Sequence, residues 1–275
     1  MQRRFVQVDV FGTGQLSGNP LAVVIQAQGL PDATLKAFAN WTNLSETTFL
    51  LPPTDPAADY RVRILTASTE YPFAGHPTLG SAHAWLEAGG IPKTPGVVIQ
   101  ECGAGLVPVR LAEDGTLAFA APPRTRKGEV DPETRRQAAI TLGIPESEWV
   151  ACAWGVNGPP WLLVQVADAA TVRGITPNLI DGYDHVGVVG FEPEGSPITY
   201  EVRGFAGGFE DPVTGSLNAA LAQWLRERGA VPADYAAAQG SQLGRAGRIT
   251  IHDDGTDIWM GGAVRTVIAG TADLA

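Results

Sequence analysis

Cysteine is scarce in this chain, and its scarcity excludes one class of protein. Only two cysteines, Cys102 and Cys152, occur among the 275 residues, so at most one disulfide can form. The disulfide framework that stabilises many small secreted domains is therefore excluded. A chain that does not depend on disulfides is typical of a reducing compartment, and we expect it in the cytoplasm.

Long apolar runs are also missing. No stretch approaches the ~18 consecutive apolar residues that a membrane-spanning helix needs. The first ten residues alternate in polarity and include Asp9, whereas a signal peptide has a continuous apolar stretch. We therefore expect no membrane partner.

Positive charge is in short supply. There are 19 Lys and Arg against 29 Asp and Glu, which gives a net charge of −10 and a pI of about 4.8. An acidic surface repels phosphate backbones, so we expect no nucleic-acid partner. No His, Cys and carboxylate cluster has metal-ligand spacing, and the loop Gly12-Thr13-Gly14 lacks both a Walker lysine and a dinucleotide pattern. We expect neither a metal nor another bound cofactor.

What the chain does have is apolar alternation in short segments. Hydrophobic residues make up 44% of a chain long enough for two domains of about 130 residues each. The pattern predicts an α/β protein with strands at 5–11, 21–25, 47–51, 60–65, 106–111, 161–166, 186–189, 198–203, 248–252 and 265–269. It predicts helices at about 32–41, 77–87, 132–143 and 216–228.

Two of these helices look like copies of one another. The segment 75–86 can be aligned with 214–225, so that Trp85 matches Trp224, and both segments are rich in Ala and Gly. Small residues on most faces are typical of a helix that is packed on all sides. Coincidence between two Ala-rich helices is the alternative. The favoured interpretation is two related halves, 1–121 and 131–275, joined by a linker at 122–130, with the C-terminal strand as a candidate to join the first half.

The starts of these two helices are candidate anion sites. Gly75-His76-Pro77 and Thr214-Gly215-Ser216 each place a glycine turn before a helix, where free N–H groups and the helix dipole favour a carboxylate. His76 and Asp211 lie in these turns. Each is either functional or structural, His76 as a core histidine and Asp211 as a turn residue or helix cap.

Glu46 stands directly before an apolar strand. Desolvation there would raise the pKa of its carboxyl and suit general acid–base chemistry. From the residue alone, a solvated carboxylate at a strand start is the simpler interpretation.

Four motifs, in order, resemble the signatures of the phenazine-biosynthesis-like (PhzF) family. They are 17–23 (SGNPLAV), 43–47 (NLSET), 73–78 (FAGHPT) and 210–216 (EDPVTGS), and the glycine-containing segments near 239–245 and 261–264 also fit. The resemblance covers essentially the whole chain. It implies the diaminopimelate-epimerase fold: two pseudo-symmetric α/β halves, each a curved, mostly antiparallel sheet around a central helix, with the active site between them.

The resemblance also implies roles for particular residues. Glu46 would be the general acid–base, with His76 and Asp211 as its polar partners, and the enzyme would use no cofactor. The substrate, a small carboxylic acid, would be bound by Asn19, Gly75, Thr214, Gly215 and Ser216. We also expect a homodimer.

The chain departs from the epimerase branch at the helix starts, which hold no thiols. Cys102 lies in a predicted hairpin and Cys152 in an apolar stretch, so both are interpreted as structural. One carboxylate is enough to move a proton between two carbons on one face, so isomerisation is favoured over epimerisation. A catalytically silent binding relative and an epimerase that pairs Glu46 with Asp211 or His76 stay open as alternatives.

Overall fold

The chain forms two compact units in a computed structural model that describes residues 1–274. Unit 1 comprises Met1–Ala120 together with the segment from Gly261 to the C-terminus, and unit 2 comprises Ala121–Met260. The segment 122–130, predicted as a linker, falls at the beginning of unit 2 and includes strand β9 (Arg126–Gly128).

Unit 1 is a curved sheet with two helices, α1 (Asp32–Thr42) and α2 (Gly75–Glu87). Its strands pair in the order β18–β1–β2–β3–β4–β6–β7–β8, and β5 pairs with the end of β4. The pairs β2–β3 and β4–β6 are parallel and the others are antiparallel. The strands are β1 (Gln2–Val10), β2 (Asn19–Ile25), β3 (Thr47–Leu51), β4 (Tyr60–Leu65), β5 (Glu70–Tyr71), β6 (Val97–Cys102), β7 (Gly105–Leu111), β8 (Leu117–Ala120) and β18 (Val264–Asp273).

Helix α2 lies at the centre of unit 1, because β1, β2, β3, β4, β6, β7, β8 and β18 all contact it. Its small residues allow this close packing. A Cβ on Gly80 would lie 2.5 Å from Cδ2 of Leu21 and 3.0 Å from Cγ2 of Val8, so only glycine fits against β2 and β1 here. This confirms the expectation of a helix packed on most faces.

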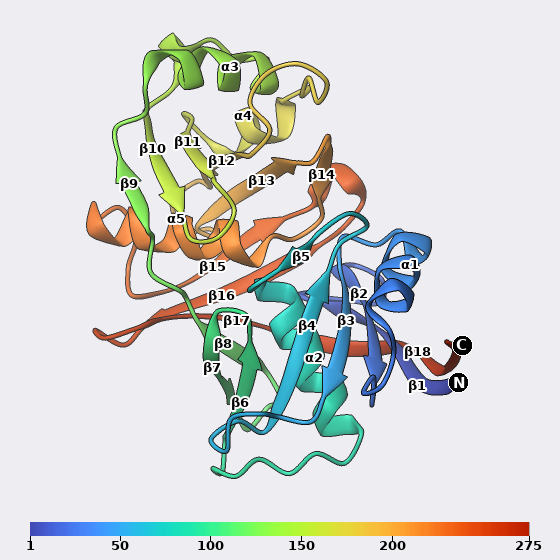
Figure 1. The fold of residues 1–275 in the computed structure, drawn as a ribbon. Coiled ribbons are helices and arrows are strands. Elements are labelled where there is room, and N and C mark those ends of the chain that lie inside the picture. The colour runs from blue at the N-terminus through green and yellow to red at the C-terminus, as the bar shows by residue number, and fades with distance from the viewer. Residues whose placement is uncertain (275) are drawn as a thin grey trace. The chain divides into compact units, whose positions relative to one another are not determined.

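The two ends of the chain meet in unit 1. Strand β18 pairs antiparallel with β1 along the whole length of β1, from Gln2 opposite Asp273 to Val10 opposite Val264 (Figure 1). The C-terminal strand therefore completes the sheet of the first half of the sequence.

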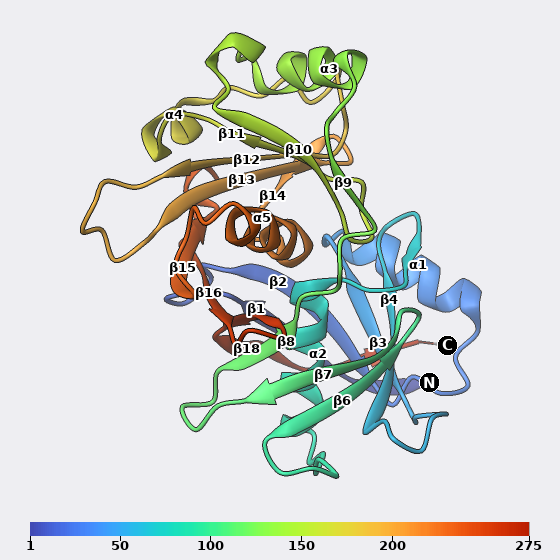
Figure 2. The ribbon, with the colours of Figure 1, turned by 90° about the vertical axis from the view of Figure 1, so that its left-hand side faces the viewer.

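Unit 2 repeats this plan around its own central helix, α5 (Gly215–Glu227), which is seen nearly end-on below β12 and β13 in Figure 2. Its strands pair in the order β9–β10–β11–β12–β13–β15–β16, with β14 on the end of β13. They are β10 (Ala151–Val156), β11 (Leu162–Gln165), β12 (Val186–Phe191), β13 (Tyr200–Ala206), β14 (Phe209–Asp211), β15 (Asp234–Gln239) and β16 (Gly247–Asp253), followed by β17 (Ile258–Gly262). Outer helices are α3 (Pro132–Leu142) and the short α4 (Ala169–Gly174).

The repeat is real, but its predicted register is wrong by one residue. Both central helices begin at glycine, Gly75 and Gly215, and both have 13 residues, so Trp85 corresponds to Leu225 and not to Trp224. The preceding hairpins agree with this register. Arg63 and Arg203, 140 positions apart, each make two hydrogen bonds to the corresponding glutamate, Glu70 or Glu210.

Candidate functional site

The structure brings three of the predicted residues together in unit 1. Glu46 lies directly before β3, His76 is the second residue of α2, and Asn19 begins β2. His76 Nε2 lies 3.5 Å from Glu46 Oε2, and His76 Nδ1 lies 3.4 Å from the amide nitrogen of Asn19. The parallel pairing of β2 with β3 and the packing of α2 against both strands place these side chains side by side.

Burial makes His76 a neutral partner. Its side chain is 4% exposed, and desolvation lowers the pKa of its imidazole from 6.5 to about 3. With the amide N–H of Asn19 facing Nδ1, that nitrogen is the acceptor, so the single proton of the neutral ring belongs on Nε2. His76 therefore presents an N–H, and not a full positive charge, to the Glu46 carboxylate.

The loop before Asn19 is held in place by the buried carboxylate of Asp9. The backbone N–H groups of Ser17 and Gly18 donate to the Asp9 carboxylate over 3.0 and 2.8 Å. Asp9 is 4% exposed and Asn19 is fully buried. Asn19 therefore begins β2 from a loop whose course is fixed, and it faces His76 from inside the unit.

A second polar network supports α2 beyond His76. Gln100 on β6 donates to the Thr78 hydroxyl over 2.9 Å and accepts from the Tyr60 hydroxyl over 2.8 Å. All three side chains are buried. Because buried polar groups with satisfied hydrogen bonds hold one arrangement, this network fixes how α2 is seated in the sheet.

The remaining predicted residues gather in unit 2, where β14 leads into α5. The Thr214 hydroxyl donates to the Asp211 carboxylate over 2.6 Å. Trp161 Nε1 donates to the Ser216 hydroxyl over 3.0 Å. Gly215 is the first residue of α5, so Asp211, Thr214, Gly215 and Ser216 form one local group.

Gln239 organises the turn that leads from Asp211 into α5. In the sequence, only the resemblance to the phenazine-biosynthesis-like family pointed to this residue. Its amide oxygen accepts from the backbone N–H of Thr214, and its amide nitrogen donates to the backbone oxygen of Asp211 and to the Thr214 hydroxyl. Asn218 donates to the same Gln239 oxygen over 2.8 Å. One buried glutamine at the end of β15 thus sets the geometry of the segment that leads into α5.

Neither helix start has a capping side chain. Ala74 and Thr214 precede α2 and α5 with extended backbone and make no side-chain cap to the first turn. The first N–H groups of a helix favour an anion, and the structure therefore has the elements of the two predicted anion sites. That Glu46 and both helix starts line one pocket stays a prediction.

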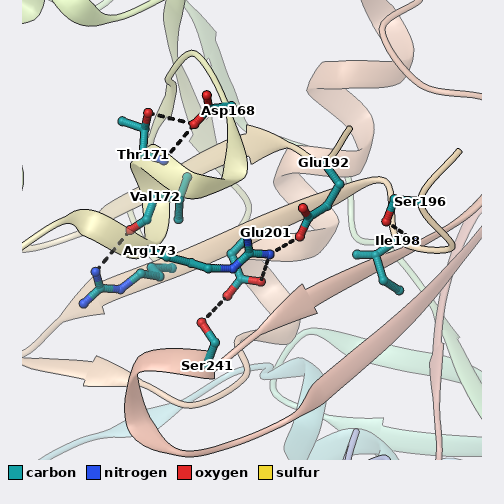
Figure 3. Close-up of polar contacts among 10 residues, drawn as sticks. Asp168, Thr171, Val172, Arg173, Glu192, Ser196, Ile198, Glu201 and Ser241 are labelled. Carbon is teal, nitrogen blue, oxygen red and sulfur yellow. Dashed lines mark hydrogen bonds and ion pairs between the residues drawn. The ribbon is translucent and has the colours of Figure 1, made fainter. Parts of the chain in front are cut away.

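A buried carboxylate contacts the loop that follows Gln239 in unit 2. Glu201 on β13 accepts from the Ser241 hydroxyl over 2.6 Å and lies 3.4 Å from Arg173, which also binds Glu192 (Figure 3). Burial raises the pKa of Glu201, while Ser241 and Arg173 oppose the rise. Ser241 is two residues beyond Gln239, so Glu201 anchors the loop that follows the site-organising strand.

The cysteines lie on strands that carry none of the predicted site residues. Cys102 ends β6 in the predicted hairpin, opposite Gly105, and Cys152 lies in β10. Burial raises the pKa of both thiols, which makes thiolate formation harder.

Within residues 1–274, no group of three or more His, Cys, Asp or Glu side chains could hold a metal ion. No helix in the same range is long and apolar enough to cross a membrane.

Comparisons with known proteins agree with the fold and the motifs. The family model described as phenazine biosynthesis-like protein (PhzC-PhzF) matches residues 8–272. A Mesorhizobium japonicum protein named as an uncharacterized isomerase is 34% identical over 90% of both chains. The trans-2,3-dihydro-3-hydroxyanthranilate isomerase of Pseudomonas aeruginosa is 28% identical over 92% of this chain and 91% of its own. The crystal structure of a Bacillus anthracis PhzF-family protein superposes with a TM-score of 0.83, covering 99% of each chain at 20% identity.

Proposed function

Because the chain belongs to the phenazine biosynthesis-like protein family, we propose that it is an isomerase that moves a proton within a small carboxylic acid. The Glu46 carboxylate is the general acid–base: it takes a proton from one carbon, and the isomer forms when another carbon receives a proton. The reaction needs no bound cofactor in this scheme. The contact between Glu46 and a buried, neutral His76 is the observation that carries the proposal.

The charge of the partner matters for the chemistry of Glu46. A cationic partner would neutralise the carboxylate and make it a weaker base. Neutral His76 instead faces the carboxylate with an N–H at 3.5 Å and leaves its negative charge in place. The side chain of Glu46 is 13% exposed, so it is largely desolvated and still has an open side toward a substrate.

We further propose how the substrate is held. The uncapped starts of α2 and α5, at Gly75 and Gly215, would bind its carboxylate and the charge that develops as the proton leaves, with the Ser216 hydroxyl as a side-chain donor. Thr214, whose hydroxyl donates to Asp211, would shape the turn from which α5 begins. Asn19, which is fully buried, would act by orienting His76. His76 fits the role of a second base poorly, because burial suppresses its protonation and its Nε2 already faces Glu46.

The test is proton exchange with solvent. A panel of small carboxylic acids is incubated with the protein in deuterium oxide, and deuterium gain is read by mass spectrometry. The relative named for trans-2,3-dihydro-3-hydroxyanthranilate makes that compound the first member of the panel, followed by 2-amino, 2-hydroxy and unsaturated acids.

Glu46→Gln should lower deuterium incorporation by about 10²–10⁴-fold, the usual contribution of a positioned general base. The exposed Glu133 on α3 provides the matched control, and Glu133→Gln should exchange like the wild type. Wild-type exchange in Glu46→Gln would remove Glu46 from the mechanism. A wild-type protein that labels no acid would favour a silent binding relative. A homodimer in the cytoplasm stays a prediction, and sedimentation of the purified protein tests its dimeric part.

A further inference from the structure

Ser216, the second residue of α5, corresponds in the internal repeat to His76, the second residue of α2. In unit 1, the amide nitrogen of Asn19, at the start of β2, faces the His76 ring at 3.4 Å. In unit 2, Trp161, directly before β11, donates its indole N–H to the Ser216 hydroxyl over 3.0 Å. Strands β2 and β11 occupy the same place in their units, because each pairs in parallel with the strand that lies antiparallel to the arginine-bearing strand. Trp161 therefore stands to Ser216 as Asn19 stands to His76.

The indole limits the directions in which the Ser216 hydroxyl can point. An indole N–H can only donate, so this bond occupies a lone pair of the Ser216 oxygen and leaves the hydroxyl proton directed elsewhere. Among residues 1–274, the structure provides no acceptor for that proton, although Ser216 is only 7% exposed. A buried hydroxyl whose proton has no acceptor costs free energy, so the site favours a bound acceptor such as a carboxylate.

Trp161 is itself held in a single orientation. It is 2% exposed, and its ring meets the His185 ring edge-on, with 5.5 Å between centroids and 68° between planes. The Nδ1 atom of His185 lies 3.1 Å from Asp184, whose carboxylate accepts from the backbone N–H of Gly207 over 2.7 Å. The backbone oxygen of Trp161 accepts from the N–H of Gly155 over 2.9 Å. The indole N–H is therefore presented to α5 in one direction.

The main chain at the start of α5 is fixed by a second contact from the same loop. The amide nitrogen of Asn157, which is 6% exposed, donates to the backbone oxygen of Ser216 over 2.8 Å. The next residue, Leu217, packs directly on β12, where a Cβ on Gly187 would lie 2.0 Å from Leu217 Cδ1. With the main chain held in this way, the rotation of the hydroxyl is the freedom that remains, and Trp161 is the residue that restricts it.

We propose that Trp161 is a positioning residue that directs the Ser216 hydroxyl at the carboxylate of the substrate, while Asn157 holds the main chain beneath it. All of these contacts lie within unit 2. The Ser216 hydroxyl donates a hydrogen bond and keeps its proton, so these residues take part in binding and not in proton transfer. The inference rests on the proposed role of Ser216 as a donor to the substrate and adds the residue that orients this donor.

A double-mutant cycle tests the role of Trp161, using the acid of the panel that the wild type labels in deuterium oxide. Ser216→Ala should lower kcat/KM for deuterium exchange by about 10–100-fold, the contribution of a hydrogen bond to a charged group, mainly through a higher KM. Trp161→Phe keeps an aromatic ring against His185 and removes the indole N–H, and it should lower kcat/KM by about 3–10-fold. In the Ser216→Ala background the same change should have an effect of less than about twofold, because the hydroxyl that Trp161 orients is gone.

Trp259→Phe is the matched control. Trp259 also lies in unit 2, is 6% exposed, and donates its indole N–H to Asp254 over 2.8 Å instead of to the start of α5. This variant loses the same kind of buried hydrogen bond and should exchange deuterium like the wild type.

A spectroscopic measurement on the wild type covers the case in which Trp161→Phe fails to fold by circular dichroism. The indole N–H signal of Trp161 is identified among the seven tryptophans as the one that Ser216→Ala shifts most. Addition of the acid should shift this signal, because a hydroxyl that donates to the substrate becomes a stronger acceptor for the indole. The signal of Trp259 should stay in place.

Several results would overturn the role of Trp161. They are an equal loss from Trp161→Phe in both backgrounds, wild-type exchange in Trp161→Phe or in Ser216→Ala, and an indole signal that the acid leaves unchanged. Wild-type exchange in Glu46→Gln overturns the proposed role of Glu46 alone. A wild type that labels no acid overturns the proposed function, and the role of Trp161 with it.

Discussion

Replacing Arg203 by methionine should destabilise the protein far more than the same change at its repeat counterpart, Arg63. Arg203 is 3% exposed, and its guanidinium makes two hydrogen bonds to the Glu210 carboxylate, over 2.9 and 2.7 Å. It also donates to the backbone oxygens of Val172 and Ile175 at the end of α4. Removing the arginine leaves a buried carboxylate and two carbonyls without this donor, and breaking a buried pair in this way costs about 3–5 kcal/mol.

Arg63 makes the corresponding pair with Glu70 near the surface. Its side chain is 24% exposed, and those of Glu70 and Asp32, its other partner, are 39% and 69% exposed. Exposed pairs contribute about 0–1 kcal/mol, because solvent screens them and remains available to each partner. The two positions share sequence context and strand geometry and differ mainly in burial, so they form a matched comparison.

Thermal unfolding followed by circular dichroism measures the difference. At roughly 2–4 °C per kcal/mol for a chain of this size, Arg203→Met should lower Tm by about 6–20 °C, and Arg63→Met by no more than about 4 °C. Adding Glu210→Leu to Arg203→Met should recover much of the loss, because no unpaired charge then stays buried. Equal, small losses at both positions would refute the reasoning from burial.

Two further predictions concern buried titratable groups. Burial raises the folded-state pKa of Glu201 above its ordinary 4.5, so the stability that its protonated form contributes is present below pH 4.5 and is lost as the pH rises through the folded-state pKa. The variant Glu201→Gln should therefore become more stable relative to the wild type as the pH rises, as measured by urea unfolding from pH 4 upward. A stability difference that stays constant with pH would contradict this sign. Cys102→Ser with Cys152→Ser should keep the wild-type exchange rate, and iodoacetamide should inactivate the wild type slowly because burial raises the pKa of both thiols; rapid alkylation that substrate prevents would point to a thiol mechanism.

Much of the fold could be predicted from apolar alternation and turn residues. The four long helices and all ten predicted strands lie where the sequence pattern placed them, since each combines a clear period with Gly, Pro or Asp at its ends. The pattern placed ten strands and missed β5, β6, β8, β9, β10, β14, β15 and β17. Of these, β15 has a sequence, DYAAAQ, that favours a helix by composition. It is a strand because it pairs on one side with β13 and on the other with β16, and these tertiary contacts override the local preference of alanine.

The site residues of unit 1 could be found from motifs, but their chemistry could not. The sequence left His76 open between a core histidine and a functional one, and only the fold shows that it is both buried and directed at Glu46. Gln239 carries no local signal, because its partners at 211, 214 and 218 are brought to it by the parallel pairing of β13 with β15.

The register of the repeat explains why sequence reasoning matched the two halves incorrectly. The two tryptophans suggested one alignment of the central helices, yet they occupy different faces: Trp85 stacks on Tyr60 at 5.6 Å, whereas Trp224 lies under the Arg228 guanidinium. The correct alignment of the helices and of the preceding hairpins is 140 positions, but β12 has six residues where β3 has five. A constant shift of 140 from Glu46 therefore arrives at Val186, inside the strand and buried. Only the pairing of each strand with its neighbour, Leu65 opposite Thr47 and Phe205 opposite Val186, moves the correspondence back by one residue, so that His185 precedes β12 as Glu46 precedes β3.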